Sequence, residues 1–123
     1  MKPDIKNRDD IIKLVDAFYD KIKMDNEIGY FFNEVSHVNW DKHLPIMYDF
    51  WENILFSTGN FSGNPMEKHK LLHQKSAMTQ SHFLHWIKVF HETIDDLYQG
   101  AKAEETKQRA VNIATAMMYK TLA

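Results

Sequence analysis

Helix-breaking residues are rare in this chain, which has only four glycines and three prolines among its 123 residues. Between them, apolar residues recur at intervals of three and four, and no stretch sustains the alternation that strands require. This spacing predicts an all-α protein in which each helix buries one face. Because 123 residues suit the size of one domain, we expect residues 1–123 to form a single domain around one core.

Capping residues and loops divide the chain into its expected helices. The first should begin near Asn7 or Asp9, and Thr79 should cap a later one. A short helical piece over 27–35, and a loop followed by a short helix over 57–73, should separate the long helices. We expect the four long helices to cover about 7–24, 39–56, 80–99 and 102–122. The inward face of the first is expected to carry Ile12, Val15, Phe18, Tyr19 and Ile22.

Charge and cysteine content exclude several classes of protein. Lys and Arg number 15 against 17 Asp and Glu, so the formal net charge of −2 offers nucleic acid no broad cationic surface. The chain has no cysteine, which excludes disulfides, a thiolate nucleophile, Cys-ligated zinc and iron–sulfur clusters. Only nitrogen and oxygen ligands remain for a metal.

The sequence contains nothing typical of a targeting or membrane segment. Met1–Lys6 lacks the apolar core of a signal peptide, and no apolar run approaches the roughly 20 residues that span a bilayer. We therefore expect a cytoplasmic protein with no membrane partner.

Four polar aromatic or imidazole side chains lie in the apolar stripes of different expected helices: Tyr19, His43, His69 and Trp86. Any one of them could find a local hydrogen-bond partner in an ordinary core. Four together favour convergence on one cavity, and a cavity with phenylalanine rings and one imidazole suits a flat apolar cofactor. Haem is the leading candidate, because it needs an imidazole for iron, an apolar slot and donors that reach a diatomic ligand.

A cofactor-free helical module for protein interaction is the alternative from another class. Tyr19, His43 and Trp86 would then be packing residues. Each would need a hydrogen-bond partner in the core to avoid a cost of about 1–3 kcal/mol, and a core without a cofactor has no need of three such groups. Absorbance separates the two hypotheses, because only the haem protein is coloured.

A non-haem metal site bound by histidines is a third interpretation. His69 and His73 are four residues apart, and His82 and His85 are three apart, so either pair could share one metal. Structural zinc sites usually need further ligands, and the His-Glu-x-x-His motif of metalloproteases is absent. A di-iron bundle would need two Glu-x-x-His pairs, whereas the chain has a single pair at residues 34–37.

Two blocks of sequence, taken together, form a specific signature: Gly63-Asn64-Pro65-Met66-Glu67-Lys68-His69 and His82-Phe83-Leu84-His85-Trp86. Shorter matches lie at Phe18-Tyr19, Phe32, Trp40-Asp41-Lys42-His43 and Asp49-Phe50-Trp51. With these residues, nearly the whole chain resembles the truncated haemoglobins, in particular the third group, which is found in bacteria. The resemblance implies a globin-like fold, truncated to a two-over-two helical sandwich around one b-type haem.

The resemblance also implies roles for individual residues. His69 would be the proximal iron ligand, Tyr19 and Trp86 the distal hydrogen-bond donors, and His43 the distal-side histidine. The segment that contains His73 departs from many family members, which are shorter and proline-rich there, so His73 stays open as the alternative iron ligand.

Aromatic residues should line the haem. Phe32 matches the phenylalanine that packs on the porphyrin in this family. The expected lining of the pocket is Phe32, Phe50, Trp51, Met66, Phe83 and Phe90.

The expected ligands of the b-type haem are O2, NO and CO. Two distal donors in a dry pocket predict tight binding and slow dissociation, which suits ligand trapping or redox chemistry better than oxygen delivery. Nitric oxide detoxification and peroxidase-like turnover are further reactions that the resemblance allows, and the sequence does not decide between them. Both would need electrons from a separate reductase, for which this chain has no room.

Overall fold

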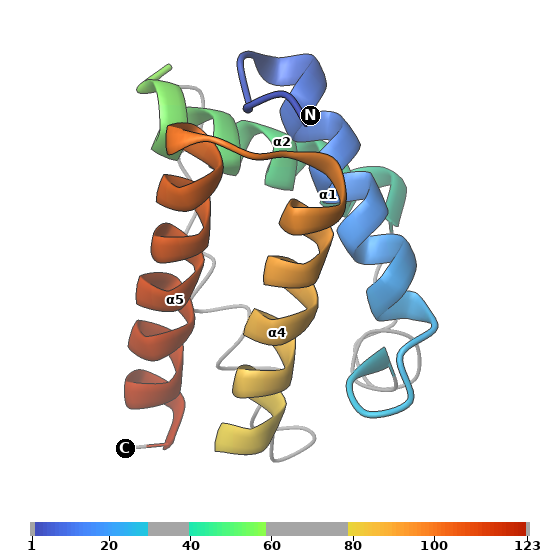
Figure 1. Ribbon diagram of the computed structural model, residues 1–123. Coiled ribbons are helices and arrows are strands. Elements are labelled where there is room, and N and C mark those ends of the chain that lie inside the picture. The colour runs from blue at the N-terminus through green and yellow to red at the C-terminus, as the bar shows by residue number, and fades with distance from the viewer. Residues whose placement is uncertain (1, 30–39, 59–78, 123) are drawn as a thin grey trace.

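The computed structural model describes residues 2–29, 40–58 and 79–122. They form four helices, which are α1 (Arg8–Lys23), α2 (Trp40–Phe56), α4 (Gln80–Leu97) and α5 (Ala101–Leu122) (Figure 1). The predicted all-α class is confirmed. The short helix expected after residue 64 and most of the piece over 27–35 lie outside the described residues. In the described part, no helix is long and apolar enough to cross a bilayer.

The helices associate in two pairs, α1 with α2 and α4 with α5, and α1 also packs against α4. Residues 98–100 connect α4 to α5, so these two helices run side by side in opposite directions (Figure 1). The two pairs are therefore joined by the contact between α1 and α4, and most of the buried aromatic residues lie at or next to this contact.

Helix α1 begins as expected but buries a slightly different stripe. The Asn7 side chain accepts a hydrogen bond from the Asp10 backbone N–H at 3.2 Å, which is an ordinary N-cap. The expected inward position of Ile12 is wrong, since Ile12 is half-buried whereas Ile11 is fully buried. Either of the two adjacent isoleucines could begin an apolar stripe along the helix. The stripe that contains Ile11 and Leu14 is the one that faces α4 and α2. The buried residues of α1 are Ile11, Leu14, Val15, Phe18, Tyr19 and Ile22.

The N-terminal segment, which is far from α5 in the sequence, caps the start of that helix. The carboxylate of Asp4 accepts hydrogen bonds from the backbone N–H groups of Lys102 at 2.9 Å and Ala103 at 2.8 Å. Gly100 precedes the helix with a φ of +147°, and a Cβ there would lie 2.6 Å from Cγ of Asp4. Glycine therefore serves two needs at this turn, a backbone conformation that other residues rarely adopt and room for the capping carboxylate.

Replacing Asp4 with alanine is expected to lower the free energy of unfolding by about 0.5–2 kcal/mol at neutral pH, the usual cost of a lost N-cap. Burial opposes ionisation of Asp4, but hydrogen bonds from the backbone of Lys102, Ile5 and Ala103 outweigh it and hold the pKa of Asp4 below its usual value. A lowered pKa stabilises the fold above the unfolded pKa of about 4, and this contribution is lost as the pH falls through the folded pKa.

Urea unfolding at several pH values tests the Asp4 prediction. The difference between wild type and Asp4→Ala should be full at pH 7 and shrink below about pH 4. Asp20→Ala, which removes an exposed carboxylate from α1, is the control and should change stability little. An equal effect of the two substitutions would show that the Asp4 cap contributes nothing measurable.

Candidate functional site

The crossing of α1 and α2 buries Tyr19 against two ring systems of the other helix. The phenol of Tyr19 is 5% exposed. Its ring centroid lies 5.1 Å from that of His43, edge to face, and 5.3 Å from that of Trp40. Burial raises the pKa of Tyr19 well above its usual value, so the hydroxyl keeps its proton at physiological pH and can donate a hydrogen bond.

His43 stands beside Tyr19 with one ring nitrogen turned away from water. The side chain is half-buried, but its Nε2 atom is fully buried. In a neutral imidazole one ring nitrogen donates and the other accepts, so His43 can serve either role at this position. The structure thus brings two of the predicted distal residues, Tyr19 and His43, into direct ring contact.

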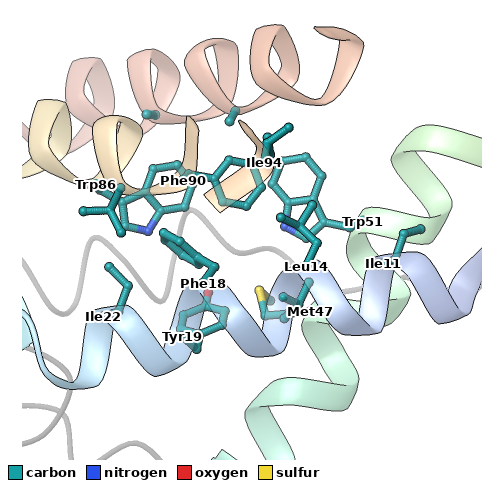
Figure 2. Close-up of a cluster of buried hydrophobic side chains, with 14 of the residues drawn as sticks. Ile11, Leu14, Phe18, Tyr19, Ile22, Met47, Trp51, Trp86, Phe90 and Ile94 are labelled. Carbon is teal, nitrogen blue, oxygen red and sulfur yellow. The ribbon is translucent and has the colours of Figure 1, made fainter. Parts of the chain in front are cut away.

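Trp86 of α4 carries a buried donor. Its side chain is 7% exposed, and Nε1 is buried with no hydrogen-bond partner among the described residues. An indole N–H in that condition costs about 1–3 kcal/mol, and such groups are uncommon in native cores unless a ligand or water meets them. Phe18 lies between Trp86 and Tyr19, at 5.0 Å from Tyr19 and 5.4 Å from Trp86 (Figure 2).

Trp86 belongs to a stack of three aromatic rings. Phe90 lies between the indoles of Trp86 and Trp51, with centroid distances of 5.6 Å and 5.0 Å and interplanar angles of 7° and 22° (Figure 2). Phe18 meets Phe90 edge to face at 4.9 Å. Because stacked and edge-on pairs of rings are favourable, these contacts join α1, α2 and α4 in one aromatic cluster around Trp86.

Comparison with known proteins places this arrangement in a family. The family model described as bacterial-like globin matches residues 4–120. The group 3 truncated hemoglobin Ctb of Campylobacter jejuni is 32% identical over 126 residues, which covers 98% of this chain and 97% of that protein. The chain belongs to the group III truncated haemoglobins. The crystal structure of a group III truncated hemoglobin from Campylobacter jejuni matches with a TM-score of 0.84 and 28% identity, covering 98% of this chain and 95% of that chain.

The comparison confirms the predicted family and its two-over-two globin fold. A truncated haemoglobin implies haem, and the described residues fit that group on their own chemistry. The buried indole N–H of Trp86 lacks a protein partner among them, while the ring stack on Phe90 gives it apolar aromatic surroundings. A cofactor-free module would leave that N–H without a function.

Four of the predicted lining residues lie in the described helices. Phe83 and Phe90 are fully buried, Trp51 is buried, and Phe50 packs edge-on against Trp51 at 5.4 Å while remaining half-exposed. The remaining predicted residues lie outside the described part of the chain, so the iron ligand and part of the lining stay predictions; these are Phe32, Met66, His69 and His73.

His82 and His85 have separate roles in holding α4. Nδ1 of His82 accepts a hydrogen bond from the Thr79 backbone N–H at 2.9 Å, which caps the helix. Nε2 of His85 lies 2.6 Å from the carboxylate of Asp25, just beyond α1, and Nδ1 lies 3.1 Å from Glu27. In the described ranges no group of three or more His, Asp or Glu side chains could hold a metal ion, so the pair gives no support to a non-haem metal site.

Proposed function

We propose that this truncated haemoglobin binds a b-type haem and takes O2, NO and CO as ligands. The observation that carries the proposal is the buried Nε1 of Trp86, a donor with no hydrogen-bond partner in the described part of the chain. A small electronegative ligand would meet this donor and remove its desolvation cost. Membership of the family supports the same conclusion independently.

The lack of cysteine excludes a c-type haem. Covalent attachment of a c-type haem uses a Cys-x-x-Cys-His motif, and this chain has no cysteine. The haem, when bound, supplies an iron atom at which a diatomic ligand coordinates. We propose His69 as the residue that holds the iron, with His73 as the alternative, and the ring stack on Phe90 as part of the apolar lining.

The protein's own contribution on the distal side is to donate hydrogen bonds and exclude water. Tyr19 donates through a hydroxyl whose pKa burial raises, so it stays protonated. Trp86 donates through Nε1, and His43 offers a ring nitrogen next to Tyr19. Phe18 fills the space between Tyr19 and Trp86 and keeps bulk water from weakening their hydrogen bonds.

Two donors favour slow release of a ligand that carries partial negative charge. For that reason we propose ligand trapping, nitric oxide detoxification or peroxidase-like turnover rather than oxygen delivery. Nitric oxide detoxification and peroxidase-like turnover would need electrons from a separate reductase. We further propose that residues 1–123 form one globin domain and that the protein acts in the cytoplasm.

Absorption spectra after haem reconstitution test the proposal. We expect one haem per chain, with a Soret band that shifts when CO is added to the reduced protein. A well-folded helical protein that takes up no stoichiometric haem would overturn the proposal and favour the cofactor-free interaction module.

Substituting Trp86 with phenylalanine is expected to speed oxygen dissociation about 10-fold, because a hydrogen bond to a ligand with partial negative charge is lost. Trp51→Phe is a useful comparison, since both indoles stack on Phe90. Stopped-flow dissociation rates should change less in Trp51→Phe, although both variants lose packing. Equal rates in the two variants would show that Trp86 acts only as a packing residue.

A further inference from the structure

Trp40 forms a trio of rings with Tyr19 and His43, two of the proposed distal residues. Its ring centroid lies 5.3 Å from that of Tyr19 and 5.7 Å from that of His43, and those two are themselves in contact. Trp40 and His43 are both half-buried, whereas Tyr19 is buried. The indole therefore covers one side of the buried Tyr19 ring while it keeps partial contact with solvent itself.

A cation from α1 lies against the same indole. Nζ of Lys23 is 4.6 Å from the centroid of the Trp40 ring, within the range of a cation–π interaction. Lys23 follows Tyr19 by four residues, so both side chains project from the same face of α1 one turn apart. Helix α1 thus contacts Trp40 through a buried phenol and a half-buried ammonium group.

We propose that Lys23 holds Trp40 closed over Tyr19 and His43, and that this contact limits how fast a ligand enters from that side. The inference rests on the proposed function, since it concerns access to the same distal residues. Lys23 and Trp40 act here as positioning residues that touch neither ligand nor haem. Tryptophan is the ring that binds cations most strongly, which suits an indole held by an ammonium group.

Opening the trio would separate Trp40 from Lys23 as well as from Tyr19. The cation–π contact therefore adds directly to the barrier for entry.

Two lysines in the last turn of α1 provide a matched test. Lys23→Met removes the cation and keeps an unbranched apolar chain, and Lys23→Arg keeps the cation. Lys21→Met removes a neighbouring cation that pairs instead with Asp96 at 2.7 Å. None of these side chains is buried, so all three variants should fold.

The rate of CO association after flash photolysis is the first readout, and the infrared stretching band of bound CO, which senses nearby donors, is the second. Lys23→Met should bind CO about two- to fivefold faster and broaden or split the band, because Tyr19 and His43 lose a fixed neighbour. Lys23→Arg and Lys21→Met should match wild type in both measurements.

Either of two results would overturn the inference while leaving the proposed function intact. One is a wild-type rate and band in Lys23→Met, and the other is an Arg variant that behaves like the Met variant. If wild-type protein forms no CO complex, the proposed function itself is wrong and the inference fails with it.

Discussion

Replacing Tyr19 with phenylalanine is expected to raise the rate constant for oxygen dissociation about 10- to 100-fold. The hydroxyl donates to a ligand that carries partial negative charge, and hydrogen bonds to charged groups contribute about 1.5–3 kcal/mol. Because 1.4 kcal/mol corresponds to a factor of ten at room temperature, losing that donor gives a change of this size. Oxygen association should change far less, since the phenylalanine ring occupies the same space.

The surroundings of Tyr19 allow this substitution to remove the hydroxyl while the ring contacts remain. Burial raises the pKa of the phenol, so the wild-type group is a neutral donor throughout the working pH range. Its ring contacts with Phe18 at 5.0 Å and with Trp40 at 5.3 Å do not depend on the hydroxyl. Stopped-flow mixing of the oxygenated protein with excess CO measures the dissociation rate directly.

Tyr48→Phe is the matched control for Tyr19→Phe. The Tyr48 hydroxyl donates to the carboxylate of Asp16, between α2 and α1. Burial, followed by the hydrogen bond to Asp16, raises the pKa of Tyr48 to about 12, so this phenol too is neutral. The control should leave oxygen dissociation unchanged. A Tyr19→Phe rate equal to that of the control would remove Tyr19 from the set of distal donors.

Local features of the chain were predictable because they depend on neighbours in sequence. Asn7 and Thr79 begin α1 and α4 as their capping chemistry predicts. The predicted second long helix over 39–56 agrees with α2, which the structure describes over Trp40–Phe56, and Pro45 is accommodated within it. Helical spacing settles the class and these bounds, since each requires only residues within one or two turns.

Contacts between distant residues could not be predicted in the same way. Asp4 caps α5 and Asp25 bonds to His85, which pair residues far apart in the chain. The hydroxyl of Tyr98 likewise donates to the backbone carbonyl of Asp10 at 2.9 Å. No periodicity encodes such pairs, because they arise only once the helices cross at particular angles.

The residues of the candidate site were predictable from the sequence, whereas the contacts between them were not. Tyr19, His43 and Trp86 could be singled out from the sequence because a polar ring in an apolar stripe is locally visible. That Tyr19 meets His43 directly, whereas Phe18 separates Tyr19 from Trp86, depends on the packing of α1 against its neighbours. The Lys23–Trp40 contact gave no sequence signal, because a lysine in the last turn of a helix is ordinary.

Removing the imidazole of His69 is expected to have the largest effect of all on haem binding. His69→Gly should lose stable five-coordinate haem, since the proximal nitrogen is the one covalent link that a b-type haem has with the protein. Adding free imidazole should restore the reduced and CO spectra, because glycine leaves room for the small ring. His73→Gly should bind haem like wild type without imidazole.

Comparing His69→Gly with His73→Gly, with and without imidazole, distinguishes loss of the iron ligand from misfolding. A variant that merely misfolds cannot be rescued by imidazole, so recovery of the Soret band shows that the pocket persists and that only the ligand was missing. If imidazole is required by His73→Gly instead, the proximal role belongs to His73. If neither variant needs imidazole, another side chain holds the iron, and His43 becomes the first to examine because its Nε2 is already buried beside Tyr19.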